Sequence, residues 1–155
     1  MREIDAIDQK ILAALQNDGR ITNVDLAARV GISAPPCLRR KQELEDYGFI
    51  RGYYADVDPA KVGYEVSAFL FIGLVSQTNS EVEAFGERIR LWPLVREAFA
   101  LSGNVDFLLH CIAPNLRAFQ VFLTETVMKS PGVLTVRTAI AIHVVKRSGR
   151  VPFLE

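Results

Sequence analysis

The sequence has few of the features that mark secreted, metal-binding or membrane proteins. Cys37 and Cys111 stand in unrelated segments, with no CxxC pair and no histidine at metal-ligand spacing near either of them. We therefore expect neither a disulfide framework nor a zinc site. The longest apolar stretch, residues 66–75, is much shorter than the roughly 20 residues of a membrane helix, and the first ten residues lack a secretory signal. These absences predict a cytoplasmic protein without metal, cofactor or membrane partner.

The chain also lacks net charge, since 18 lysines and arginines balance 18 aspartates and glutamates. Half of its 155 residues are hydrophobic and 23% are charged, which excludes disordered, collagen-like and low-complexity proteins. A chain of this length forms either one domain or two small ones. The order of the predicted elements favours two.

The first thirty residues predict two helices. Apolar residues recur at three- and four-residue steps up to residue 18, which indicates a helix with one apolar face. Asp5 is placed to cap its start and Gly19 to end it. Thr22, followed three residues later by Asp25, predicts the start of a second, short helix that stops at Gly31.

A third helix follows closely. We expect it to begin at Pro36, because each proline disfavours the helical conformation of the residue before it, and to end at Gly48. Two helices joined by so short a turn make a helix-turn-helix candidate. Residues 49–64 are rich in aromatic and β-branched side chains and are broken by Asp58-Pro59 and Gly63. They predict a strand that leads into a linker.

The second half has a different pattern, in which strands and helices alternate. The expected elements are a strand over 65–75, a helix from Ser80, strands over 95–102 and 106–113, a helix capped by Asn115, and a strand from Val133 to about Lys146. Gly103-Asn104 marks a hairpin turn between the two middle strands. One side of the helix capped by Asn115 is expected to carry Leu116, Phe119, Phe122, Leu123 and Val127.

The order β-α-β-β-α-β is that of a split βαβ sandwich, in which two helices cover one face of a four-stranded sheet. The uncovered face needs a partner. The apolar residues available for it are Phe69, Phe71, Leu108, Ile140, Ile142 and Val144. We expect the chain to dimerise through this sheet.

Three segments of the first half, IDAIDQKILAALQNDGR, DLAARVGIS and CLRRKQELEDYGFIRGYYADVDPAKVG, resemble the amino-terminal half of the Lrp/AsnC family of transcription regulators. In the second half, SGNVDFLL, SPGV and VVKRSGRVPF resemble the amino-acid-sensing domain of that family, in the expected order. The resemblance covers essentially the whole chain. It implies an α+β protein with a winged-helix-like helix-turn-helix domain (1–52), a strand-containing linker (53–63) and a ferredoxin-like sensing and oligomerisation domain (64–155).

The helix-turn-helix pattern predicts which residues contact DNA. The second helix of such a motif places its first turns in the major groove, where arginine can hold guanine or a phosphate with two hydrogen bonds. The predicted DNA-binding residues are Thr22, Asn23, Ser33, Ala34, Pro35, Pro36, Leu38, Arg39, Arg40 and Arg51. An alternative for Arg39 is a solvated ion pair with Glu43 at helical spacing. An alternative for Arg40 is a structural role in packing.

The resemblance also implies where an effector binds, because family members hold amino acids between dimers at the turn after the second strand of the sensing domain. The corresponding residues are Leu101, Ser102, Gly103, Asn104, Val105 and Asp106, with Thr138 as a further candidate. A glycine turn exposes N–H groups for a carboxylate, and an aspartate can hold an ammonium group. Apolar surroundings favour a leucine-, methionine- or valine-like side chain. The alternative is a plain hairpin turn.

The function expected from these observations is sequence-specific regulation of transcription by a nucleoid-associated homodimer that assembles further into tetramers or octamers. Two alternatives stay open. One is an enzyme like the sirohaem decarboxylases, which resemble the same two-domain family, with His110, His143 and Arg137 as the basic residues. The other is an architectural DNA-binding protein that responds to no effector.

Overall fold

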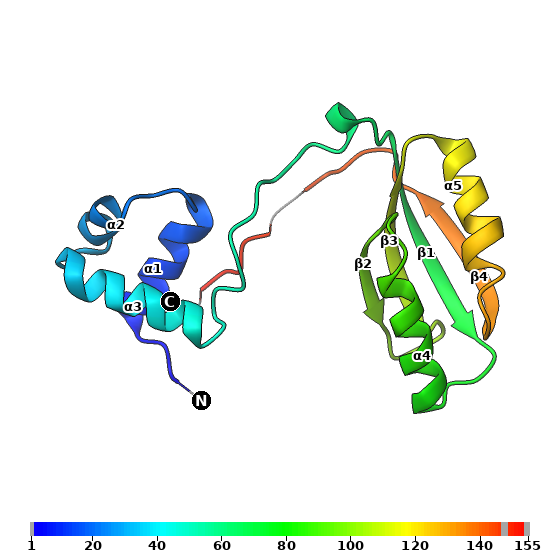
Figure 1. Cartoon of the computed structure of the whole chain (residues 1–155), viewed down its shortest axis with the longest axis horizontal. Coiled ribbons are helices and arrows are strands. Elements are labelled where there is room, and N and C mark those ends of the chain that lie inside the picture. The colour runs from blue at the N-terminus through cyan, green and yellow to red at the C-terminus, as the bar shows by residue number, and fades with distance from the viewer. Residues whose placement is uncertain (1, 147–148, 154–155) are drawn as a thin grey trace. The chain divides into compact units, whose positions relative to one another are not determined.

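The structure is a computed structural model that describes residues 2–146 and 149–153. The chain divides into two compact units (Figure 1). Unit 1 comprises residues 1–56 and 147–155, and unit 2 comprises residues 57–146. Each unit has its own hydrophobic core. No helix in the described part of the chain is long and apolar enough to cross a membrane.

Unit 1 begins with two capped helices, as the sequence predicts. Helix α1 (Ala6–Asn17) starts at a capping box in which the Asp5 carboxylate accepts from the Asp8 N–H and the Asp8 carboxylate accepts from the Asp5 N–H. Helix α2 (Asn23–Val30) is capped by Thr22 and ends at Gly31, whose φ of 84° favours glycine. Both helices bury apolar residues in the core of unit 1.

Helix α3 spans Ala34–Asp46, so the prediction that Pro36 would be its first residue is wrong. The first helical N–H groups have no acceptor within the helix, so two prolines in this turn remove no helical hydrogen bond. The first main-chain bond of the helix is made by Cys37, whose N–H donates to the Ser33 carbonyl at 3.3 Å. The helix therefore begins at Ala34 with Ser33 as its cap.

The strand predicted after α3 is not formed in the described chain. Residues 49–58 have no strand partner and are largely exposed, and only a short 3-10 turn, Ala60–Val62, follows them. The carboxyl-terminal segment 149–153 belongs to unit 1, although the sequence assigned it to the second domain. The Gln16 side chain of α1 accepts from the Val151 N–H (2.6 Å) and donates to the Val151 carbonyl (3.1 Å), and Phe153 packs against the core of unit 1.

Unit 2 confirms the predicted β-α-β-β-α-β order. Its elements are β1 (Val66–Leu74), α4 (Asn79–Arg90), β2 (Val95–Ala100), β3 (Phe107–Ala113), α5 (Leu116–Phe122), continued by a π-helical turn over Leu123–Val127, and β4 (Val133–Ile140). The strands form one sheet in the order β2-β3-β1-β4, and every neighbouring pair is antiparallel. This is the ferredoxin-like architecture (Figure 1).

Two details of unit 2 differ from the prediction. Leu116 is 58% exposed, whereas Phe119, Phe122 and Val127 are buried. Leu116 is the first residue of α5 and lies off the face that packs on the sheet. Strand β4 ends at Ile140, which pairs with Ala68 of β1, instead of near Lys146. One further main-chain bond follows, from the Ala141 N–H to the Ser67 carbonyl at 2.9 Å.

The sheet has one covered face and one open face. Along β1 the burial alternates strictly, and the even-numbered residues from Val66 to Leu74 pack in one core with residues of α4 and α5 such as Phe85 and Phe119. The opposite side, here called the open face, carries Ser67, Phe69, Phe71, Gly73, Glu97, Phe99, Leu108, His110, Ile112, Thr135, Arg137 and Ala139. Of the residues predicted for this face, Ile140 pairs with buried Ala68 on the covered side.

Candidate nucleic-acid interface and ligand-binding turn

The amino-terminal turn of α3 presents a small exposed surface. Ser33, Pro35, Leu38 and Arg39 are exposed, whereas Ala34 and Pro36 are half-buried. In the described chain Ser33 makes no side-chain capping bond. The reason is that the second and third residues of α3 are both prolines, which have no N–H to donate to a cap. The Ser33 hydroxyl is therefore not used by the helix that it caps.

The two arginines of α3 differ in their contacts. Arg39 is 68% exposed, and its NH1 lies 2.6 Å from Oε1 of Glu43, one turn along the helix. Arg40 is 23% exposed, and its NH1 donates to Asp5 Oδ2 at 2.8 Å and to Asp8 Oδ1 at 2.9 Å. These bonds to Asp8 and Asp5 raise the pKa of the Arg40 guanidinium above its usual value. The contacts of Arg40 support the structural alternative.

Asp8 is the centre of this ion-pair network. It is 1% exposed, and its Oδ2 also accepts from Arg2 NH2 at 2.9 Å. The same Arg2 nitrogen lies 3.2 Å from Glu43 Oε2. A buried carboxylate is stable only when it is paired and hydrogen-bonded, and here two arginines supply both. The network fixes α3 to the start of α1. Asp8 was not singled out from the sequence; the Asp5-to-Asp8 spacing of a capping box could have indicated its local role, but not its contact with α3.

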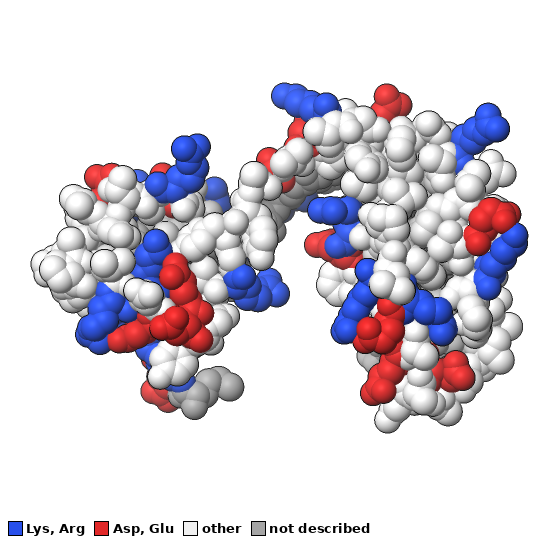
Figure 2. All heavy atoms as spheres, in the orientation of Figure 1, with Lys and Arg blue, Asp and Glu red and all other residues white. Residues whose placement is uncertain are grey.

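The other predicted DNA-binding residues lie at helix ends. The Thr22 hydroxyl accepts from the Asp25 N–H (3.1 Å) and donates to Asp25 Oδ2 (2.7 Å), so it is engaged in capping. Asn23, the first residue of α2, is exposed, and so is Arg51 after α3. Nine basic and ten acidic residues lie in the first 63 positions. Figure 2 accordingly shows basic and acidic side chains intermixed on the visible face of each unit.

The predicted effector turn connects β2 to β3 as residues 101–106. Asp106 Oδ2 accepts from the Leu74 N–H at 2.6 Å, and the Asp106 N–H donates to the Ile72 carbonyl at 2.8 Å. These bonds fasten the turn to the end of β1. Gly103 has a φ of 143°, a conformation that favours glycine. Thr138 is exposed on β4, and β1 lies between that strand and β3.

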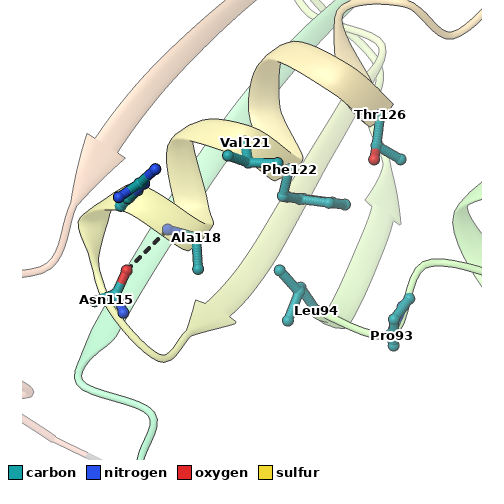
Figure 3. A pocket seen from close by; sticks show the side chains of 8 residues that line it. Pro93, Leu94, Asn115, Ala118, Val121, Phe122 and Thr126 are labelled. Atoms are coloured by element: carbon teal, nitrogen blue, oxygen red, sulfur yellow. Dashed lines mark hydrogen bonds between the residues drawn. The ribbon is translucent and has the colours of Figure 1, made fainter.

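A separate open groove of about 550 Å³ lies between α5 and the chain that enters β2 (Figure 3). It is lined mainly by apolar side chains, among them Leu94, Val121 and Phe122, with Arg117 as its charged residue. The dashed line in Figure 3 is the bond from the Ala118 N–H to Asn115 Oδ1, which caps α5 as predicted. None of the predicted effector residues lines this groove.

The open face also brings together polar residues that sequence reasoning did not connect. Ser67 Oγ lies 2.9 Å from His110 Nε2, and His110 Nδ1 lies 3.6 Å from Glu97 Oε2. The Phe69 ring stacks on the His110 ring with centroids 5.0 Å apart. Only the strand registers, which the sequence does not specify, could have shown these neighbours. Arg137 lies on the edge strand β4, so β1 separates it from His110 on β3.

Comparison with known proteins decides the family. The model of the Lrp/AsnC ligand binding domain matches residues 67–151, and that of a winged helix-turn-helix DNA-binding domain matches residues 4–51. The chain belongs to the Lrp/AsnC family. Its relatives include the leucine-responsive regulatory protein of Rhizobium meliloti (strain 1021), 54% identical over 144 residues (93% of this chain, 92% of the relative). The Bkd operon transcriptional regulator of Pseudomonas aeruginosa is 40% identical over 142 residues (92% and 93%).

Solved structures of the family agree with this fold. A transcriptional regulator from Neisseria meningitidis in complex with L-Met has a TM-score of 0.91 at 35% identity and covers 97% of each chain. An AsnC family transcriptional regulator from Agrobacterium tumefaciens has a TM-score of 0.89 at 35% identity (96% of this chain, 97% of that one). The matches confirm a transcription regulator with a helix-turn-helix DNA-binding domain and a ligand-binding domain. The named relatives are all transcription regulators.

Proposed function

We propose that this Lrp/AsnC regulator reads operator DNA with the first turns of α3, and that an apolar amino acid bound at the turn 101–106 between dimers modulates the binding. The observation that carries the proposal is the exposed Arg39 at the start of the second helix of a helix-turn-helix. With this activity, the protein acts in the cytoplasm, bound to the DNA of the nucleoid.

Arg39 is the base-reading residue in this proposal. An exposed ion pair at i,i+4 contributes only a few tenths of a kcal/mol, so the guanidinium can leave Glu43 for a guanine or a phosphate. The Ser33 hydroxyl is placed to donate to a phosphate, because the helix does not use it for capping. Leu38 and Pro35 supply apolar contact, and Asn23 and Arg51 supply further polar contacts. Arg40 contributes by holding α3 on α1.

Assembly compensates for the balanced charge of unit 1. A surface without excess positive charge gains little from counterion release, so one unit alone binds DNA weakly. Dimers formed through the open face, and tetramers or octamers built from them, present several α3 helices to repeated half-sites at a high effective concentration. In the dimer, the segment 49–58 pairs as a strand with its copy, which gives it the partner that a single chain does not offer.

The effector contacts follow from the turn. Main-chain N–H groups around Gly103 hold the carboxylate, and the Asp106 carboxylate holds the ammonium group beside the Leu74 N–H. A leucine-responsive relative and a solved relative that contains L-Met support an apolar amino acid as the ligand. Since the turn lies between dimers, the ligand shifts the equilibrium among assemblies and thereby changes which half-sites are reached together.

The DNA contact is tested by replacing Arg39 with alanine. A lost bidentate base contact weakens operator binding by about tenfold or more, while binding to unrelated DNA and the oligomer mass stay unchanged. The matched control is Arg90→Ala, because Arg90 is also an exposed helical arginine paired with a glutamate, but lies in unit 2. A mobility-shift titration in which Arg39→Ala and Arg90→Ala bind the operator equally would refute the placement of α3 in the groove.

The effector is tested by adding each amino acid in turn to the full chain, with light scattering for mass and a mobility shift for DNA binding. Leucine, methionine or valine is expected to change one or both readouts, and aspartate and lysine to change neither. A response that persists in a variant with Asn104→Pro, which disrupts the turn, would place the ligand elsewhere. Indifference to every amino acid would favour the architectural protein.

A further inference from the structure

The groove between α5 and the chain that enters β2 has an apolar body. Its apolar wall is formed by four side chains, Leu94, Ala118, Val121 and Phe122. Figure 3 shows Val121 and Phe122 on α5 at one side of the groove and Leu94 at the other. The volume of about 550 Å³ lies within the range of small-molecule sites. The groove therefore has the size and the lining of a site for a small apolar ligand.

The polar groups of the groove are suited to an anion. Arg117 is exposed and makes no ion pair with any described residue. Asn115 accepts a helix N–H with its Oδ1, which leaves its NH2 group available as a donor, and the Thr126 hydroxyl also lines the groove. Among the described residues that line it, none is acidic, and the neighbouring Glu125 is paired with Lys129. The groove thus offers a cation and further donors, but no carboxylate for a cationic ligand.

The groove is separate from the predicted effector turn. Pro93 and Leu94 precede β2 and the turn 101–106 follows it, so a strand of six residues, about 20 Å long, lies between the two places. Helix α5 continues into a π-helical turn, Leu123–Val127, which contributes Thr126 to the groove. Single π-helical turns of this kind are frequent at functional sites. The turn and the groove can therefore hold different ligands at the same time.

We propose that the groove binds a small monocarboxylate that has an aliphatic tail and no amino group. The Arg117 guanidinium holds the carboxylate, with which it can form two hydrogen bonds, and the tail packs between Leu94 and Val121. An α-amino acid binds less well, because its ammonium group would lie beside Arg117 without a carboxylate to compensate it. At the turn, Asp106 supplies such a carboxylate. The two places therefore distinguish an amino acid from its deaminated counterpart.

Binding is tested by titrating the full chain with 4-methylpentanoate, which is leucine without its amino group. Trp92 reports the binding, because its ring lies 5.8 Å from that of Phe122, which lines the groove. We expect a saturable change in tryptophan fluorescence, with a dissociation constant that rises about tenfold or more in Arg117→Ala. The uncharged 4-methylpentanamide should bind about tenfold or more weakly than the acid and should be indifferent to Arg117→Ala.

The matched control is Lys129→Ala, because Lys129 is an exposed cation just beyond the same helical segment but does not line the groove. It should leave the dissociation constant unchanged. The absence of a saturable response up to about 10 mM, or equal binding by Arg117→Ala and Lys129→Ala, would overturn the site. Leucine is titrated into Asn104→Pro, in which the effector turn is disrupted. There it should bind about tenfold or more weakly than 4-methylpentanoate, and equal binding would overturn the preference for acids without an amino group.

Val121→Glu distinguishes a small ligand from a second copy of the chain in the groove. Val121 is 53% exposed, so the substitution places a negative charge in the groove without disturbing the core. We expect it to abolish the binding of 4-methylpentanoate and to leave the mass in light scattering unchanged. A lower mass in the absence of ligand would show that another copy covers the groove, and would overturn the proposal.

Discussion

Replacement of Asp8 by alanine tests whether the buried network of unit 1 holds α3 in place. Asp8 is 1% exposed and bonds to Arg2 and Arg40, both at 2.9 Å. Removing one partner of a buried ion pair costs 3–5 kcal/mol, because the remaining charge is left without compensation. Arg2 and Arg40 are 17% and 23% exposed, so water reaches them in part. We therefore expect the lower end, about 3 kcal/mol of the free energy of unfolding of unit 1.

The single tryptophan makes the measurement selective. Trp92 lies in unit 2, packed edge-on against Phe85 and Phe122, so its fluorescence follows the unfolding of that unit. Helical circular dichroism follows both units. In Asp8→Ala the first dichroism transition should move down by on the order of 10–20 °C, while the tryptophan transition stays in place.

The matched control is Asp46→Ala, which removes an exposed acid from the last turn of α3. A surface substitution of this kind changes stability by no more than about 0.5 kcal/mol. Asp8→Asn should fall between the two, since the amide keeps a hydrogen-bond acceptor but not the charge. If Asp8→Ala were as stable as Asp46→Ala, the ion pairs of Asp8 would contribute nothing net and the reasoning would be refuted.

Two further predictions concern titratable groups. Burial raises the pKa of the Cys111 thiol to about 12, and burial also raises that of Cys37 above 9.0; both thiols should therefore resist a thiol reagent at about pH 8 in the folded protein and react once it is denatured. The hydrogen bond from the Asp8 N–H and, after it, the one from Arg40 lower the pKa of Asp5 below 3.8. The ionised Asp5 carboxylate therefore contributes its full stabilisation above pH 3.8, and this contribution is lost as the pH falls through the lower pKa that Asp5 has in the folded protein. Asp5→Asn keeps a capping oxygen, and its dichroism should show a weaker loss of unit 1 helix below about pH 4.

The sequence predicted those features of the fold that depend on neighbours along the chain. Caps at Asp5, Thr22 and Asn115 are local hydrogen bonds, and each is formed as predicted. The succession of strands and helices along unit 2 followed from the pattern of apolar residues and from the turn and capping residues between them. The start of α3 was misplaced, because the rule for residues before proline is a preference and the first turn of a helix tolerates proline.

The candidate site was less predictable, because it depends on contacts across the chain. The spacing on α3 favoured a packing role for Arg40, but it does not identify Asp8, 32 positions earlier, as the partner. Likewise, the pairing of Glu97 with His110 follows from a strand register with an irregularity between Val95 and Glu97. A register shift of one residue would turn Glu97 to the covered face.

The segment 49–58 illustrates a limit of another kind. Its aromatic and β-branched residues predict a strand. An extended segment becomes part of a β-sheet only when a second main chain supplies the hydrogen-bond partners for its N–H and C=O groups. The described chain gives this segment none. The residue pattern therefore indicates which conformation a segment can adopt, and whether the segment forms a strand depends on a neighbouring strand to pair with. If the segment pairs with its copy, amide exchange in residues 49–58 should slow as the chain dimerises with rising protein concentration. Exchange in this segment that does not change with concentration would contradict the pairing.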